Sequence, residues 1–232
     1  EVIFAIKLLQ KGYSIIHAGC LKYRDEGVLV VALRDTGKTS TVLSLLDGKN
    51  FRFMSDDQVI INRDSKALCY PRKVNISPYT LTSDVLKPSN DIKSRIKRRL
   101  ARSKFEIIFG DILKITMGDL REVPRELIEK EAEIKKVFVL SGGYDSDGIR
   151  EIDNENVVKR ILVNTFEIYN LLSVYSLNFY YQLFDFDIFN LIDRQRKIIE
   201  EALKNAECYE IRANKVKEYP MMVKRILGEN YA

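Results

Sequence analysis

A short segment near the start of the sequence combines residue types that bind phosphate. Residues 32–41 read Ala-Leu-Arg-Asp-Thr-Gly-Lys-Thr-Ser-Thr, and Gly37, Lys38 and Thr39 match the end of the pattern G-x-x-x-x-G-K-[ST]. In that pattern the glycine lets the backbone approach a phosphate, the lysine reaches the β- and γ-phosphate oxygens, and the threonine hydroxyl binds Mg²⁺. The segment therefore predicts a nucleotide site, with ATP and Mg²⁺ as the expected ligands.

The first half of this loop departs from the pattern. Ala32 stands where a glycine is usual, and an alanine fits only if that position does not need a positive φ angle. Asp35 places a carboxylate where an anion should bind, which repels the ligand unless a metal ion or Arg34 offsets its charge. Two interpretations stay open: a loop that binds a nucleotide, and a loop that keeps the fold but has lost its ligand. The residues we expect to contact a nucleotide are Ala32, Arg34, Asp35, Thr36, Gly37, Lys38, Thr39 and Ser40.

Two neighbouring aspartates are the expected acidic partners of the loop. Asp56 and Asp57 directly follow the predicted strand Phe51–Met54. Phosphoryl transfer needs a carboxylate that holds Mg²⁺ or its water, or that accepts the proton of the attacking hydroxyl. Paired aspartates in a turn after a strand are ordinary in themselves, so their place one helix and one strand after Lys38 is what makes them candidates.

His17 is the only histidine of the chain and lies one hairpin before the loop. A lone histidine beside an apolar run such as Ile15-Ile16 is commonly a hydrogen-bonded group of the core. Only its place in the order of motifs makes it a catalytic candidate.

The elements that must position these residues follow from the hydrophobic pattern. The apolar run Val28–Leu33 predicts a buried strand, and Lys38–Leu46 predicts a helix that Gly48 ends. Other short runs rich in β-branched and aromatic residues predict strands at Val2–Ile6, Ile15–Tyr23, Phe51–Met54, Val59–Asn62 and Ala67–Tyr70. Because a single helix interrupts these strands, we expect a mixed sheet with the loop at its centre.

The second half of the chain returns to strands and then becomes mainly helical. We expect strands at Glu133–Leu140 and Cys208–Arg212, two or three helices within residues 154–206, and a closing helix at Pro220–Leu227. The aromatic-rich stretch Tyr175–Phe189 is interpreted as core. The whole chain is predicted to be one domain over residues 1–232. Its parts would be a strand-rich nucleotide-binding core (1–79), a basic helical insertion (80–133), and closing strands and helices (134–232).

The insertion contains a strongly basic segment. Asp91–Arg102 has many lysines and arginines around a thin apolar stripe, as expected for a helix. It is either a solvated surface helix or a docking face for an acidic protein or nucleic acid. No aromatic residue lies among these cations, so stacking on nucleic-acid bases is not favoured.

Composition bounds the class of protein. The chain has 232 residues, of which 46% are apolar and 31% charged, and a net charge of +5, which does not by itself imply nucleic acid. Three scattered cysteines in no metal-ligand spacing indicate reduced thiols and a cytoplasmic location. The first residues lack the features of a signal peptide, and polar residues interrupt the longest apolar region, so we expect no membrane span. A homo-oligomer stays open.

The order of the motifs resembles a known family. His17, the loop 32–39, Ser55-Asp56-Asp57 and Tyr70-Pro71-Arg72 follow one another as in the C-terminal kinase domain of HPr kinase/phosphorylase and its relatives. The specific matches lie within residues 17–73. The resemblance implies an α/β fold with a mixed β-sheet, the P-loop fold of the phosphoenolpyruvate carboxykinase/HPr kinase type, with a C-terminal helical layer.

The resemblance also implies roles for individual residues. Asp56 or Asp57 would act as base or Mg²⁺ ligand with His17 beside it, and Lys38 and Thr39 would hold phosphate and Mg²⁺. The candidates are thus Asp56, Asp57 and His17 for catalysis, Thr39 and Asp56 for metal binding, and Arg72 as an additional phosphate clamp.

Three functions follow from these residues. The first is an ATP- and Mg²⁺-dependent kinase that phosphorylates a hydroxyl of a small molecule or of a protein serine. The second is a catalytically degenerate, nucleotide-binding regulator, which the atypical loop favours. The third, a carboxykinase acting on oxaloacetate, needs a further metal-ligand set and a substrate domain for which 232 residues leave little room. No segment matches the phosphorylase-specific part of HPr kinase, so neither phosphorolysis nor HPr as substrate is expected.

Overall fold

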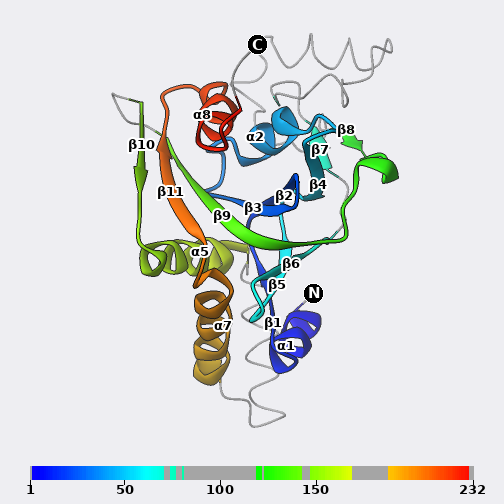
Figure 1. Cartoon of the computed structure of the whole chain (residues 1–232). Helices are drawn as coiled ribbons and strands as arrows, with labels where there is room; N and C mark the ends of the chain where they lie inside the picture. The colour runs from blue at the N-terminus through cyan, green and yellow to red at the C-terminus, as the bar shows by residue number, and fades with distance from the viewer. Residues whose placement is uncertain are drawn as a thin grey trace, which may run out of the picture.

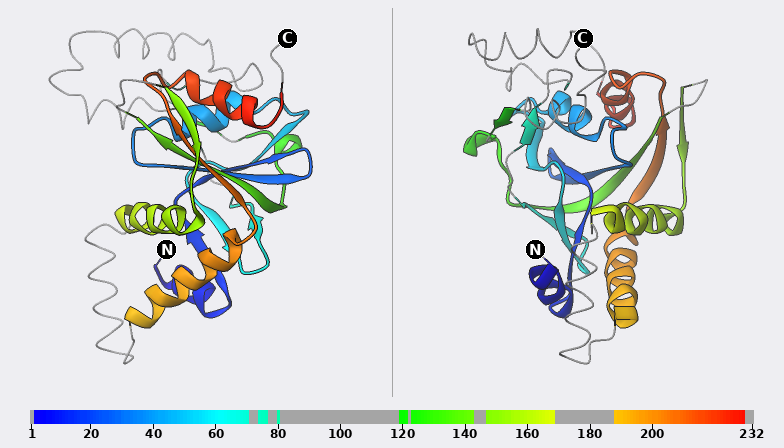
Figure 2. Two further views of the ribbon diagram at one scale, coloured as in Figure 1. Left: turned by 60° about the vertical axis from the view of Figure 1, so that its left-hand side comes forward. Right: turned by 180° about the vertical axis from the view of Figure 1, so that it is seen from behind.

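The computed structural model describes residues 2–70, 74–76, 80, 119–121, 123–142, 147–168 and 188–229. Within them, a curved mixed sheet lies between two groups of helices (Figure 1). The two further views show the same layers: α2 and α8 cover one face of the sheet, and α5 and α7 cover the other (Figure 2). The coarse expectation of a mixed α/β fold is confirmed, with the C-terminal helices divided between the two faces rather than forming one layer.

Nine strands of the described residues form the main sheet. Its order is β1-β5-β6-β9-β3-β2-β4, with β11 also paired to β9, and β10 paired to β11. Strands β3, β9 and β11 run parallel to one another, and the other pairs in this sheet are antiparallel. The bounds are β1 Tyr13–Ile16, β2 Gly19–Tyr23, β3 Glu26–Ala32, β4 Phe51–Ser55, β5 Val59–Asn62, β6 Lys66–Leu68, β9 Glu131–Ser141, β10 Gly148–Glu151 and β11 Glu207–Arg212. A separate pair consists of β7 Val74–Ile76 and β8 Asp119–Arg121.

The helices pack on both faces of this sheet. Their bounds are α1 Val2–Gln10, α2 Lys38–Leu45, α5 Asn154–Ile168, α7 Ile188–Leu203 and α8 Glu218–Ile226, with a 3₁₀ turn at Arg125–Leu127. No helix of the described residues is both long and apolar enough to cross a bilayer.

The central strands are buried on both sides, which explains their continuous apolar runs. In β3, Leu29 and Val31 join the cluster under α5 and α7, while Val28 and Val30 join the cluster under α2 and α8. Because β3 lies between β9 and β2 inside the sheet, the residues that follow Ala32 leave from the middle of the molecule.

The predicted strand at Val2–Ile6 is wrong, since these residues begin helix α1. The apolar run alone does not distinguish a strand from a buried helix. Ala5, Ile6 and Leu9 are buried at helical spacing, and α1 packs on β1 and α7. Gly12, at a φ of 84°, follows the helix with its amide bonded to the Leu9 carbonyl.

The predicted strand Ile15–Tyr23 is divided into β1 and β2, which have different neighbours. β1 pairs with β5, whereas β2 pairs with β3 and β4. The break falls at His17, and the Ala18 amide turns back to the Ile16 carbonyl. The histidine is therefore at a corner of the sheet and not inside a ladder.

Several expectations lie outside the described residues. These are the phosphate clamp Arg72, the basic segment Asp91–Arg102, and most of the aromatic stretch Tyr175–Phe189. The division into three parts and the single-domain assignment remain predictions. Strand β10 was not expected, because its four residues Gly-Ile-Arg-Glu carry too little hydrophobic pattern.

Candidate functional site

The predicted phosphate loop connects β3 to α2. Residues 33–37 leave the end of the strand, and helix α2 begins at Lys38 with Gly37 as N-cap. The cap has no side-chain hydrogen bond. Because the first N–H groups of a helix have no partner inside it and carry partial positive charge, this end of α2 suits an anion.

Glycine is required at two positions around the loop. Gly37 has a φ of 110°, and a Cβ there would lie 2.7 Å from Val216 Cγ1. A Cβ at Gly19 would lie 2.5 Å from Val42 Cγ2 and 3.6 Å from Lys38 Cγ, so this glycine lets β2 approach α2. The loop is therefore held close to the strand that follows His17.

The two departures from the glycine-rich pattern have local explanations. Among the described non-glycine residues, positive φ angles occur at Arg24, Asp35 and Ser65, so Ala32 does not need one. Ala32 is instead the last residue of β3, paired with Leu140 and buried. Asp35 has a φ of 62°, a conformation that aspartate tolerates better than most residues. It preserves a backbone shape usually left to glycine, and it is exposed rather than enclosed by the loop.

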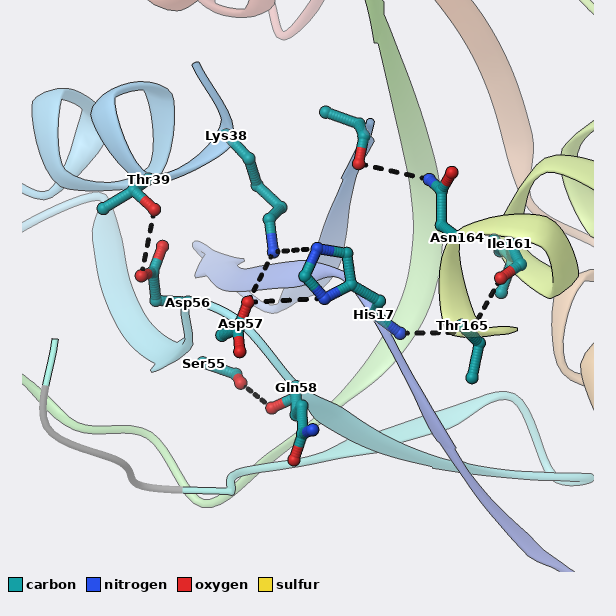
Figure 3. Close-up of polar contacts among 11 residues, drawn as sticks. His17, Lys38, Thr39, Ser55, Asp56, Asp57, Gln58, Ile161, Asn164 and Thr165 are labelled. Atoms are coloured by element: carbon teal, nitrogen blue, oxygen red, sulfur yellow. Dashed lines mark hydrogen bonds and ion pairs between the residues drawn. The ribbon is translucent and has the colours of Figure 1, made fainter. Parts of the chain in front are cut away.

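Lys38 is the centre of a polar cluster that brings three predicted residues together. Its Nζ lies 3.1 Å from His17 Nε2 and 3.2 Å from Asp57 Oδ1 (Figure 3). His17 Nδ1 lies 3.3 Å from the same Asp57 oxygen. Lys38 is buried, whereas the Asp57 side chain is 52% exposed, so the cluster opens to solvent through Asp57.

The His17 imidazole is neutral in this arrangement. Burial, with the neighbouring Lys38 charge, lowers its pKa to about 4, against the weaker opposite effect of Asp57. An ammonium has only donors, so Nε2 accepts from Lys38 and the ring proton belongs on Nδ1. This tautomer puts the ring N–H on the buried nitrogen that lies 3.3 Å from Asp57 Oδ1, in a geometry that does not make a hydrogen bond.

Thr39 and Asp56 form the second pair of the site. The Thr39 hydroxyl donates to Asp56 Oδ2 over 3.1 Å, while Asp56 Oδ1 is buried and accepts no hydrogen bond from the described residues (Figure 3). Burial raises the Asp56 pKa to about 6, an effect that Lys38 and the Thr39 hydroxyl oppose and Asp57 strengthens. A buried carboxylate oxygen without a donor is suited to a cation.

The donor set fits Mg²⁺ as P-loop proteins bind it. In those proteins a loop Ser or Thr and an aspartate from a neighbouring strand hold the ion together with phosphate oxygens. Thr39 and Asp56 are these two residue types at hydrogen-bond distance. Within the described part of the chain, His, Cys, Asp and Glu side chains form no group of three that would hold a metal by themselves.

Two residues of α5 support the site, and sequence reasoning missed both. Asn164 Nδ2 donates to the Ala32 carbonyl over 3.2 Å, and Thr165 Oγ1 accepts the His17 amide over 3.3 Å. Their polar side chains stand in a helix whose other residues follow the amphipathic pattern. Nothing in the sequence signals that a helix so far along the chain reaches this corner.

A cavity of about 670 Å³ adjoins the loop at the carboxyl ends of β3, β9 and β11. This is the edge at which α/β sheets usually bind ligands. Leu33, Val163 and Val216 line the cavity and are 54%, 57% and 37% exposed, unusual values for large apolar side chains in a folded protein. The cavity thus offers apolar surface next to the phosphate loop.

Charged groups surround the same cavity. The predicted loop residues Arg34, Asp35 and Thr36 line it on one side, and Lys159 and Arg160 of α5 line it on another. Lys38 and its partners His17 and Asp57 do not line this cavity. Ser40 is buried in the first turn of α2.

A buried carboxylate holds Arg160 in place. Glu210 is 0% exposed, and it accepts from Arg160 Nη2 at 2.7 Å, from Arg150 Nε at 2.6 Å and from Ser141 Oγ at 3.1 Å. Arg212 Nη2 lies 3.0 Å away. Burial opposes ionisation, but these hydrogen bonds outweigh it and lower the Glu210 pKa to about 2. Of the arginines around Glu210, Arg160 lines the cavity and contributes a positive charge to its wall.

Comparisons with known proteins add little beyond these contacts. No protein-family profile and no curated protein matches the sequence. Among solved structures, one match is the HPr(Ser) kinase/phosphatase from Coxiella burnetii, with 11% sequence identity over 93% of this chain and 94% of that one, and a TM-score of 0.41. A TM-score of this size transfers neither fold family nor activity, so function has to be argued from the site itself.

Proposed function

We propose that this protein binds a magnesium–nucleoside triphosphate at residues 32–40 and transfers its γ-phosphate to a hydroxyl group. The observation that supports this most is the meeting of Thr39 with Asp56, at 3.1 Å, beside that of Lys38 with Asp57, at 3.2 Å. Two segments separated by a helix and a strand thus bring together one hydroxyl, one ammonium and two carboxylates at a helix N-terminus. This set matches what phosphoryl transfer needs.

The roles proposed for these residues follow from how far each is buried. Thr39 and Asp56, whose Oδ1 is buried, would hold Mg²⁺, which neutralises the charge of the phosphates when it is bound. Lys38 would exchange its contacts with His17 and Asp57 for contacts with phosphate oxygens, which the N–H groups at the start of α2 would also bind.

Asp57 is proposed as the base, because it is the carboxylate that solvent and an acceptor can reach. The acceptor oxygen forms a bond to the γ-phosphorus while the bond to the β,γ-bridging oxygen breaks. The acceptor proton passes to Asp57, and the nucleoside diphosphate leaves with the electron pair of the broken bond. The neutral His17 ring lies beside Asp57, with Nδ1 3.3 Å from Oδ1, and would limit how far this carboxylate can turn.

The cavity beside the loop is proposed to receive the nucleoside. It touches loop residues 32–36, so a nucleotide with its phosphates on the loop can extend into it, and Leu33, Val163 and Val216 offer apolar contact to a planar base. The fold would then be of the P-loop kinase type, as the motif order within residues 17–73 predicted.

Two measurements test the proposal. Calorimetry of the purified protein with Mg²⁺ and ATP, and with Mg²⁺ and GTP, should detect binding. Incubation of protein, γ-labelled nucleotide and a metabolite or cell extract should label an acceptor. Asp57→Asn should bind nucleotide as the wild type does but label the acceptor far more slowly. Binding without labelling in any extract would favour the nucleotide-binding regulator, and absence of binding would refute the proposal.

A further inference from the structure

Helix α5 carries two consecutive polar residues that face the protein interior. Asn164 and Thr165 are each 3% exposed. A buried polar group is costly unless it is hydrogen-bonded, and both are bonded to backbone of the candidate site. Asn164 Nδ2 donates to the Ala32 carbonyl over 3.2 Å, and Thr165 Oγ1 accepts the His17 amide over 3.3 Å while donating to the Ile161 carbonyl over 2.7 Å (Figure 3).

The two backbone groups lie where the chain leaves the sheet. Ala32 is the last residue of β3, and the phosphate loop begins immediately after it. His17 lies in the break between β1 and β2, so neither strand ladder includes its amide. At both places α5 supplies a contact from outside the sheet: it adds to the pairing of Ala32 with Leu140, and it holds the His17 amide, which no ladder includes.

A small rotation at either point would displace the groups that meet phosphate. The His17 ring contacts Lys38 at 3.1 Å and Asp57 at 3.3 Å, and a tilt of the His17 backbone would break both contacts. A shift of Ala32 would move the whole loop, because the loop begins at the residue that directly follows Ala32. Displacements of catalytic or binding groups by about 1 Å are enough to impair such sites.

We propose that Asn164 and Thr165 are positioning residues of the phosphate site, Asn164 setting the root of the loop and Thr165 setting the place of the His17 imidazole. The consequence for nucleotide affinity rests on the proposed function, whereas the effect on the imidazole does not. Since Lys159, Arg160 and Val163 of the same helix line the cavity, α5 is in contact with both parts of the site.

The test uses the fact that His17 is the only histidine of the chain. The protein therefore gives one set of imidazole C–H signals in a proton NMR spectrum. In Thr165→Val the signal should move and its titration midpoint should rise from about 4 toward the ordinary value, because the released ring gains solvent and loses Lys38. Thr165→Ser retains the hydroxyl and should restore the wild-type signal.

Asn164→Leu should weaken Mg²⁺–ATP binding about tenfold, a free-energy change of about 1.4 kcal/mol. Asn154→Leu is the matched control, since Asn154 is in the same helix and donates to the Leu203 carbonyl over 2.6 Å, away from the site. It should lower stability without changing the imidazole signal or the affinity.

Two results would overturn the inference: an unchanged imidazole titration in a folded Thr165→Val protein, or equal effects of Asn164→Leu and Asn154→Leu on affinity. If Thr165→Val does not fold, Thr165→Ala is measured in its place by the same criterion. If the wild type binds no nucleotide, the proposed function fails, while the imidazole comparison still decides whether Thr165 positions His17.

Discussion

Replacing Asp56 by asparagine should make the protein more stable at neutral pH while impairing its metal binding. Asp56 is a partly buried residue whose Oδ1 is buried, and the only hydrogen bond to its carboxylate among the described residues comes from Thr39. Burial raises its pKa from an ordinary 3.8 to about 6. The folded protein therefore binds more protons than the unfolded chain between these two pH values, and stability falls as the pH rises through this window.

The size of the effect follows from the same values. A pKa raised from 3.8 to about 6 corresponds to a destabilisation of about 3 kcal/mol once Asp56 is ionised. Asparagine keeps the shape and can still accept the Thr39 hydrogen, but its amide nitrogen also needs a partner. We therefore expect Asp56→Asn to be more stable than wild type by about 1–3 kcal/mol at pH 7.5. The difference should shrink toward zero near pH 4.

Urea unfolding of both proteins at pH 4.5, 6 and 7.5, with and without Mg²⁺ and ATP, measures this directly. The ligands should stabilise the wild type by about 2.7 kcal/mol at a hundred times its dissociation constant, and the variant much less. Asp57→Asn is the control, because Asp57 is half-exposed and paired with Lys38, so its loss should give no stabilisation. An Asp56→Asn protein that is less stable than wild type at pH 7.5, or a difference independent of pH, would refute the reasoning.

Three further predictions test other parts of the molecule. Lys38→Ala removes a charge-assisted phosphate contact and should weaken ATP binding by about 1.5–3 kcal/mol, roughly tenfold to a hundredfold, in calorimetry; equal affinities would exclude this site. Asp35→Gly removes a carboxylate while permitting the φ of 62°, and should tighten binding of metal-free ATP more than that of Mg²⁺–ATP; unchanged affinities would show that Asp35 does not influence the phosphates. Glu210→Gln should lower the free energy of unfolding by about 3 kcal/mol at pH 7, because the Glu210 pKa of about 2 means that the ionised carboxylate stabilises the fold. This stabilisation is complete above the ordinary pKa of 4.5 and is lost as the pH falls through about 2. A decrease of less than about 1 kcal/mol at pH 7 in urea unfolding would contradict the prediction.

Local sequence was enough to predict the loop between β3 and α2 and most of the strands around it. Val28–Leu33 and Phe51–Met54 are short apolar runs bounded by turn residues, and the structure has strands at both places. Helix α2 begins at Lys38 as expected, because Gly37 and the apolar positions after it are local signals. The pattern was ambiguous where an apolar run had no punctuation, as at Val2–Ile6, which is a helix.

Residue types and their order alone predicted which side chains would be candidates. The chemistry of Lys38, Thr39, Asp56, Asp57 and His17 can be read from the amino acids themselves. That these five meet within hydrogen-bond distances depends on β2 lying between β3 and β4, which the one-dimensional pattern does not contain. Their functional roles remain predictions until binding and transfer are measured.

Only the tertiary structure decided the state of each group and what supports it. Burial, which no sequence pattern states, raises the Asp56 pKa and lowers that of His17, so the pKa values of two side chains in the same site shift in opposite directions. The contacts from Asn164 and Thr165 join residues more than a hundred positions apart in the chain. Sequence predicts what is local, because helix and strand periodicity and turn chemistry act over a few residues. Long-range contacts depend on how the sheet is ordered and covered, and that ordering is a property of the folded chain.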